Sequence, residues 1–101
     1  MIGCIIQARM GSTRLPGKVM LKIDKKNPVI HYVLEQVRQS KYLDDISVAT
    51  TNLKEDDVIA EFVKNYGINI FRGSSSDVLD RYYKCAKKFS YSKIVRITCD
   101  N

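Results

Sequence analysis

The chain has 101 residues and a formal net charge of +6, with 45% hydrophobic and 28% charged residues. This length suits one small domain with a single core, and the composition excludes a disordered chain. No apolar stretch is long enough for a membrane span and no basic, cleavable leader is present, so we expect a cytoplasmic protein without membrane contact. The 3 cysteines form no C-x-x-C pair. They are typical of free thiols in a reducing compartment.

The first half of the chain predicts a strand, a polar loop and a helix. A continuous apolar run predicts a buried strand from Ile2 to Gln7, followed by a loop from Ala8 to Lys18. Alternating apolar residues then allow a short extended segment over 19–23. A first helix is predicted to begin at Pro28, with Asn27 as its N-cap. Its apolar face comprises Val29, Ile30, Val33, Leu34 and Val37.

Two more strands flank a second predicted helix. The strands run from Ile46 to Thr50 and from Ile68 to Phe71. Asn52 and Glu55 have the spacing of a capping box, and Gly67 is a natural C-terminal stop. The buried face of this helix comprises Val58, Ile59, Phe62, Val63 and Tyr66. The neighbouring acids, Asp56 among them, are interpreted as helix-start residues that suit the helix dipole.

A third helix and a fourth strand complete the pattern. Ser74–Ser76 are cap candidates for a helix from Asp77 to Phe89, and Ile94 to Thr98 reads as a strand. Asp77 and Arg81 have the spacing of an i, i+4 pair on that helix. Strands that alternate with helices predict an α/β fold with a parallel sheet of about four strands and helices on both faces.

The loop after the first strand carries the chemistry of a phosphate site. Residues 7–18 read QARMGSTRLPGK and place two glycines, two hydroxyls and three fixed positive charges side by side. Glycine lets the backbone approach an anion closely, and Arg9, Arg14 and Lys18 can neutralise several phosphate oxygens. The spacing matches neither the Walker A loop nor the dinucleotide fingerprint. Because ligands of open α/β sheets bind at the carboxyl ends of the strands, the loop predicts a nucleoside triphosphate site.

The distribution of charge favours a small phosphorylated ligand over nucleic acid. Of the 17 basic residues, 6 fall between Arg9 and Lys26, beside a single acid. A cluster at one strand end suits a triphosphate, whereas the scattered tyrosines offer no stacking platform for single strands.

Three segments resemble a known family in the same order along the chain. They are residues 5–18, IIQARMGSTRLPGK; residues 72–82, RGSSSDVLDRY; and residues 95–101, VRITCDN. Together they resemble the cytidylyltransferases that activate acidic sugars, namely the acylneuraminate and 3-deoxy-manno-octulosonate enzymes and their spore-coat polysaccharide relatives. The resemblance implies strand order 3-2-1-4 and the nucleotide-binding half of a glycosyltransferase-A-like nucleotidyltransferase fold. Because members of this family are longer, we expect residues 1–101 to be a truncated N-terminal part.

The resemblance and the loop chemistry together assign candidate site residues. Arg9 and Lys18 are the catalytic candidates, and Asp100, at the end of the fourth strand, is the candidate ligand for Mg²⁺. A second metal carboxylate of the family would lie beyond Asn101. The nucleotide-binding candidates are Ala8, Arg9, Gly11, Ser12, Thr13, Arg14, Lys18, Arg72, Gly73 and Ser74. For residues 72–76, a serine-rich helix cap is the alternative to base recognition.

The implied reaction transfers CMP from CTP to an acidic sugar and releases pyrophosphate. Two alternatives stay open: a related enzyme that uses another nucleoside triphosphate or a sugar phosphate, and a non-catalytic basic module that binds nucleotide or nucleic acid. We also expect a homodimer or another self-associated form, because the apolar fourth strand would leave one sheet edge unpaired.

Overall fold

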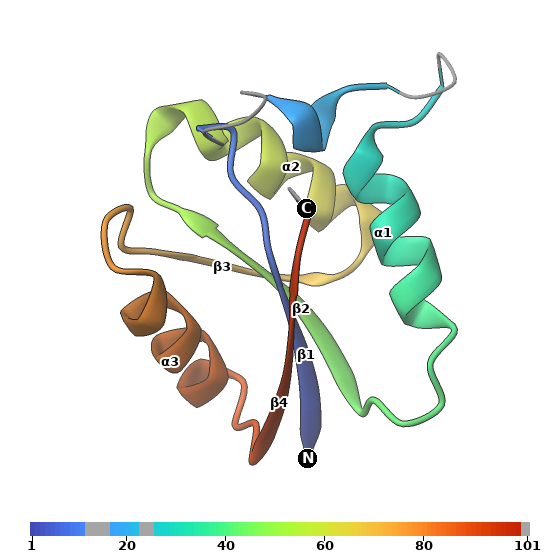
Figure 1. Ribbon diagram of the computed structural model, residues 1–101, viewed down its shortest axis with the longest axis vertical. Helices are drawn as coiled ribbons and strands as arrows, with labels where there is room; N and C mark the ends of the chain where they lie inside the picture. Colours follow the sequence, from blue (N-terminus) through green and yellow to red (C-terminus); the bar gives the residue numbers. More distant parts are fainter. Residues whose placement is uncertain (12–16, 23–25, 100–101) are drawn as a thin grey trace.

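The computed structural model describes residues 1–11, 17–22 and 26–99. Four parallel strands form one sheet in the order β3-β2-β1-β4, which confirms the predicted topology (Figure 1). The strands are β1 (Ile2–Gln7), β2 (Asp45–Thr51), β3 (Asn69–Gly73) and β4 (Lys93–Thr98). The α-helices are α1 (Val29–Arg38), α2 (Asp57–Tyr66) and α3 (Val78–Lys88), and two short 3-10 helices span Lys18–Met20 and Lys54–Asp56.

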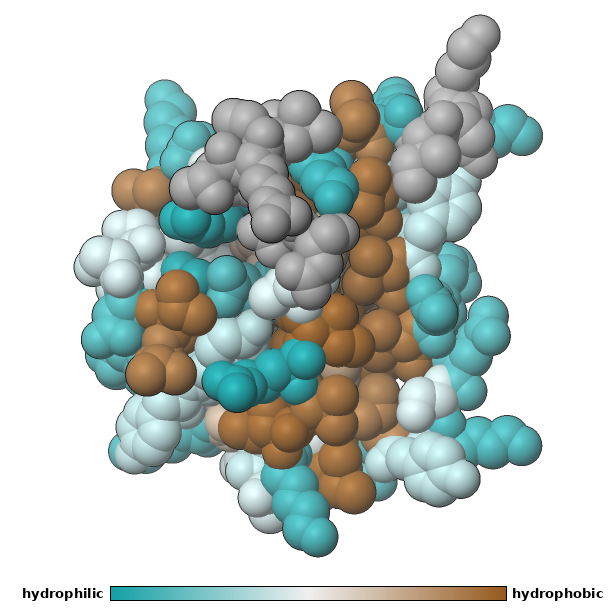
Figure 2. All heavy atoms as spheres, viewed as in Figure 1, coloured by the Kyte–Doolittle hydropathy of each residue, from teal (hydrophilic) through white to brown (hydrophobic). Residues whose placement is uncertain are grey.

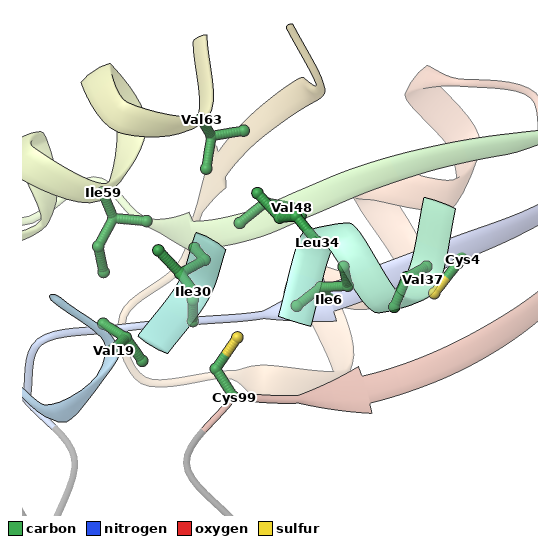
Figure 3. Packing of buried hydrophobic residues seen from close by; sticks show 11 residues of the cluster. Cys4, Ile6, Val19, Ile30, Leu34, Val37, Val48, Ile59, Val63 and Cys99 are labelled. Atoms are coloured by element: carbon green, nitrogen blue, oxygen red, sulfur yellow. The ribbon is translucent and has the colours of Figure 1, made fainter. Parts of the chain in front are cut away.

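Helices cover both faces of the sheet, as the sequence predicts. Helices α1 and α2 lie on one face, and α3 lies on the other (Figure 1). The larger core joins β1 and β2 to α1 and α2, and Figure 3 shows Ile30 and Val19 close to Cys99 within it. The smaller core joins Ile5 and Ala49 to the inner face of α3. Side chains of alternate β1 residues therefore enter different cores, which explains why the whole strand is apolar.

The strand ends differ from the predicted ones by one or two residues, and at β3 the difference matters. β3 begins at Asn69 and continues to Gly73, because its pairing with β2 extends through Thr50 opposite Arg72 and Thr51 opposite Gly73. Arg72 and Gly73 are therefore strand residues and not part of the following loop. A prediction based on apolar runs misses this extension, because the end of β3 is polar and contains a glycine.

Two predictions for the region from Lys18 to the start of α1 are wrong. The segment after the loop forms a 3-10 helix over Lys18–Met20, so the predicted extended conformation is wrong there. Pro28 is itself the N-cap of α1, one residue later than predicted, and Asn27 lies outside the helix. The reason is tertiary: Pro28 forms an antiparallel bridge with Lys22, and the Val29 N–H donates to the Leu21 carbonyl at 2.9 Å.

The capping box predicted at the start of α2 is wrong. Asp56, not Asn52, is the N-cap of α2, and a 3-10 turn precedes it. The Thr51 hydroxyl takes the capping role one turn earlier, because it accepts the Leu53 N–H at 3.1 Å. Val58, predicted to be buried, is 47% exposed. The C-terminal stop at Gly67 is confirmed, with a left-handed φ of 97°.

Helix α3 begins at an aspartate and not at a serine. Asp77 is the N-cap, and its carboxylate accepts the Asp80 N–H at 3.0 Å. Ser74 supports this turn by accepting the Asp77 N–H, also at 3.0 Å. The predicted Asp77–Arg81 pair is not what the structure shows, because the Arg81 guanidinium donates to the Ser74 carbonyl at 2.6 Å.

Cysteine chemistry and helix length agree with the sequence. Cys4, Cys85 and Cys99 are buried free thiols, as predicted. Among the residues that the structure describes, no helix combines the length and the apolar character that crossing a bilayer requires.

Candidate functional site

The carboxyl ends of the four strands meet at one edge of the sheet, where backbone hydrogen bonds tie their following loops together. The Ala8 N–H donates to Ala49 at 3.1 Å, and the Asn52 N–H donates to Gly73 at the same distance. On the other side of β1, the Cys99 N–H donates to Gln7 at 3.1 Å. The segments that carry the three family-like motifs therefore all leave the sheet at this edge.

The loop after β1 closes on itself. The Gly17 N–H donates to the Met10 carbonyl at 2.7 Å, which brings the two ends of the loop together. Gly17 has a φ of 78°, a left-handed conformation that glycine adopts without strain. The 3-10 helix that follows begins with Lys18, so this lysine lies at the C-terminal end of the loop. Ser12, Thr13 and Arg14, also predicted to bind nucleotide, lie outside the described residues.

A buried carboxylate that the sequence analysis did not assign to the site holds the start of this loop. Asp56 is 1% exposed, and its Oδ1 accepts the Met10 N–H at 2.7 Å. Its Oδ2 accepts the Thr51 hydroxyl. Because Thr51 ends β2 and Met10 follows β1, Asp56 fixes the distance between two neighbouring strand ends. The strand order could have indicated this role for Asp56. β1 and β2 are neighbouring parallel strands, so an acid just after β2 lies near the end of β1.

The predicted residues of the loop gather at this edge. Ala8 is buried, and both Arg9 and Lys18 are half-buried. Gly11 lies beside Glu55, whose Oε1 would be 3.3 Å from a Cβ at this position. The glutamate carboxylate is the end of a flexible, exposed side chain, so a Cβ at position 11 would require only a small shift of Glu55.

Arg72 has a structural role in addition to the one predicted for it. Its Nε donates to the Thr51 carbonyl at 2.9 Å and its Nη2 to the Leu53 carbonyl at 2.8 Å. Its Nη1 forms an ion pair with Asp57 at 2.7 Å. The guanidinium thus bonds three groups of the β2–α2 connection, and its role toward a nucleotide stays a prediction.

Gly73 and Ser74 lie against a second arginine, Arg81, which is 1% exposed. A Cβ at Gly73 would lie 3.3 Å from the Arg81 Cγ and 2.8 Å from the Phe71 ring, so only glycine leaves room for this packing. Burial lowers the pKa of the Arg81 guanidinium, and the nearby charge of Arg9 lowers this pKa further. Two cations, one from the loop after β1 and one from α3, therefore act on one another at the carboxyl edge.

An open hollow lies beside this edge, on the α3 side of β4. Its volume is about 590 Å³. The Arg96 guanidinium lies over the Tyr82 ring here, 5.5 Å from its centroid. The lining residues are Gln7, Val78, Tyr82, Arg96, Ile97 and Thr98. The hollow therefore borders both the end of β1 and the start of α3.

The candidate metal ligand, Asp100, lies outside the described residues. Its neighbour in sequence, Cys99, is bonded to the end of β1, beside the loop. Within residues 1–11, 17–22 and 26–99, no three His, Cys, Asp or Glu side chains gather as a metal site would require. Both Asp56 oxygens already accept hydrogen bonds, which leaves this buried carboxylate engaged within the fold.

Comparisons with known proteins agree with the motifs. Residues 3–101 match the family model described as "Cytidylyltransferase". A protein of Methanocaldococcus jannaschii, described as uncharacterized, is 53% identical over 97 residues, which cover 96% of this chain and 40% of that protein. The spore coat polysaccharide biosynthesis protein SpsF of Bacillus subtilis is 41% identical and is matched over 96% of this chain and 42% of its own length.

Solved structures show the same fold. A cytidylyltransferase from Leptospira borgpetersenii matches 98% of this chain and 41% of its own, with a TM-score of 0.92 and 41% identity. A CMP:2-keto-3-deoxy-manno-octonic acid synthetase complexed with CTP has a TM-score of 0.77 and 26% identity, over 99% of this chain and 40% of its own. The chain thus spans about two fifths of the length of these relatives.

Proposed function

The chain belongs to the cytidylyltransferase family, and on this premise we propose that the protein transfers CMP from CTP to an acidic sugar. One observation carries the proposal: a closed, glycine-containing basic loop stands at the carboxyl end of β1, held by the buried Asp56. Similarity to a synthetase solved with CTP supports the choice of nucleotide. Similarity to 3-deoxy-manno-octulosonate cytidylyltransferases supports an acidic sugar as acceptor, and similarity to SpsF supports a role in surface polysaccharide synthesis.

In the proposed reaction a sugar hydroxyl attacks the α-phosphorus of CTP. The new phosphorus–oxygen bond forms as the bond to the bridging oxygen breaks, and pyrophosphate leaves with that electron pair while the hydroxyl proton goes to solvent. Arg9 and Lys18 neutralise the phosphate oxygens, and Gly11 offers backbone N–H groups without a side chain in the way. Ser12, Thr13 and Arg14 are the further predicted contacts to the phosphates, and Ala8 is the first residue after β1.

The two remaining groups of predicted residues are assigned by their place in the fold. Gly73 and Ser74 stand at the end of β3, where small residues and backbone groups suit the edge of a pyrimidine, and Arg72 fixes that segment. Asp100 suits Mg²⁺, because this ion commonly takes one or two carboxylates and completes its shell with phosphate oxygens and water. Bound there, Mg²⁺ would add positive charge beside the phosphates.

Calorimetric titration of the chain with nucleotides tests the proposal. We expect CTP to bind more tightly than UTP, GTP or ATP in the presence of Mg²⁺. The Lys18→Ala variant should lose about 1.5–3 kcal/mol of CTP binding free energy, the scale of a charge-assisted hydrogen bond. Lys41→Ala is the matched control, because it removes the same charge from an exposed position before β2, at the other end of the sheet.

Two outcomes would contradict the proposal. Tighter binding of UTP, GTP or ATP than of CTP would favour a related enzyme with another nucleotide. Equal loss of CTP binding in Lys18→Ala and Lys41→Ala would mean that net charge, and not the loop, attracts the nucleotide, as in a non-catalytic basic module.

We further propose that the chain self-associates through β4. Within the described part of the chain this strand pairs with β1 alone, which leaves the backbone groups of its outer edge without a strand partner there. Ile94 is 41% exposed and Val95 43% exposed. Figure 2 shows an apolar band along this side of the molecule, over β4 and toward α1. An open groove between them is lined by apolar residues that include Val33, Val37, Leu43, Val95 and Ile97.

A further inference from the structure

Arg81 is a buried cation whose hydrogen bonding is incomplete. Its side chain leaves α3, packs its stem against Gly73 and donates from Nη1 to the Ser74 carbonyl at 2.6 Å. The Nε and Nη2 atoms are buried and have no hydrogen-bond partner among the residues that the structure describes. No carboxylate among the described residues forms an ion pair with this guanidinium.

This arrangement costs stability. A buried charge with unpaired donors loses its hydration without full replacement, and apolar side chains of similar volume often stabilise such positions. Asp56 is an acid whose charge acts on Arg81, but its two oxygens already accept bonds from Met10 and Thr51. Helix α3 needs only an apolar residue here to cover the sheet. The positive charge therefore requires another explanation.

The neighbours of Arg81 offer an explanation for its positive charge. Arg9 belongs to the loop after β1, and Ser74 begins the segment after β3, both at the carboxyl edge of the sheet. Two arginines held near one another repel, and a polyanion bound beside them relieves this repulsion. A charge that the fold leaves unmatched is then available to a ligand with several negative charges.

We propose that Arg81 is a positioning residue of the nucleotide site, a fixed positive charge that works with Arg9 to hold the polyphosphate part of the ligand. This inference rests on the proposed function and deepens it, because it assigns a role to a residue that lies beneath the surface. Arg81 acts on the ligand through its charge and through the Ser74 segment that it holds, and not by direct contact.

Two substitutions separate charge from packing. Arg81→Met keeps an unbranched stem beside Gly73 and removes the charge, whereas Arg81→Lys keeps the charge and loses the planar fork. We expect Arg81→Met to weaken CTP binding about tenfold or more, on the scale of one charge near a polyanion. The loss should become smaller from CTP to CDP to CMP, and Arg81→Lys should retain most of the affinity for CTP.

Thermal melts followed by circular dichroism provide the second readout. Arg81→Met should melt no lower than the parent, because an unmatched buried charge is removed. Arg38→Met is the matched control on α1, where the arginine is exposed and bonds the Tyr66 hydroxyl at 3.3 Å. This control should leave the CTP affinity unchanged.

Inorganic tripolyphosphate distinguishes this inference from the proposed function. If the parent binds tripolyphosphate in an Arg81-dependent way but does not prefer CTP among nucleotides, the inference stands and the proposed function falls. If the parent prefers CTP and Arg81→Met binds it equally well, the inference alone is overturned. It is also overturned if Arg81→Met loses the same factor for CMP as for CTP, or if the parent binds neither CTP nor tripolyphosphate.

Discussion

At the scale of single residues, the candidate site depends on two polar side chains, the buried Asp56 and the half-buried Arg72, that hold loops and not the core. Asp56 connects Met10 to Thr51, and Arg72 connects the end of β3 to the β2–α2 connection. Both side chains replace the hydrogen bonds that irregular backbone would otherwise make with water. The loop after β1 is thus positioned by side chains from other strand ends.

Removing the Asp56 carboxylate should destabilise the fold and loosen the loop together. In Asp56→Ala the partly buried Met10 N–H and the buried Thr51 hydroxyl lose their acceptor, and we expect a loss of about 1–3 kcal/mol in the free energy of unfolding. Urea denaturation measures this loss. Glu61→Ala is the matched control, since Glu61 is exposed on α2, and it should change the free energy little. Equal stability of the two variants would contradict the role given to Asp56.

Cys4 predicts a decline of stability at alkaline pH. Burial raises the pKa of its thiol from the ordinary value of 9.0 to about 11. The folded state then holds this proton more tightly than the unfolded state, so the contribution to stability is complete below pH 9 and is lost as the pH rises toward 11. Urea midpoints measured across this window should fall, and they should fall less steeply in Cys4→Ala. An equal slope in both proteins would argue against the shift.

At the scale of elements, apolar periodicity predicted every strand and α-helix, and the family resemblance implied the order of the sheet. Periodicity failed where polar residues determine the boundary of an element. β3 extends through Arg72 and Gly73 because pairing with β2 continues, and α2 begins at Asp57 because Thr51 and Asp56 reorganise the preceding turn. These are long-range effects that no local pattern contains. The same reason explains why Asp56 and Arg81 escaped the prediction of the site, whereas the loop glycines and cations did not.

At the scale of the whole molecule, β4 is the element that most constrains behaviour in solution. Its outward-facing backbone groups belong to Ile94, Arg96 and Thr98, because the N–H groups of alternate residues such as Cys99 point toward β1. An antiparallel pair of β4 strands about a two-fold axis normal to the sheet would place Val95 opposite Val95 of the second copy. Centring instead on Arg96 would oppose two like charges, which is unfavourable.

This register predicts a specific cross-link. In an antiparallel pair the two Val95 positions would form a non-hydrogen-bonded pair with Cα atoms about 4.5 Å apart, within disulfide range. Val95→Cys should therefore form a covalent dimer on mild oxidation, while Ile94→Cys, opposite Arg96 of the second copy, should not. Analytical ultracentrifugation of the parent should show a dimer at tens of micromolar. A monomer there, with no cross-link in Val95→Cys, would exclude this interface.

The pairing of β1 between β2 and β4 also governs how the chain can fold as it is made. The Met1 ammonium donates to the Ser92 hydroxyl at 2.7 Å, and the Ser92 N–H returns a bond to the Met1 carbonyl at 2.9 Å. Residues at the start of β1 therefore wait for residues about ninety positions later in the chain. Contacts so distant in sequence form slowly, and an unpaired apolar strand is prone to aggregate meanwhile. Until β4 has been synthesised, one edge of β1 lacks the strand that covers it in the folded protein.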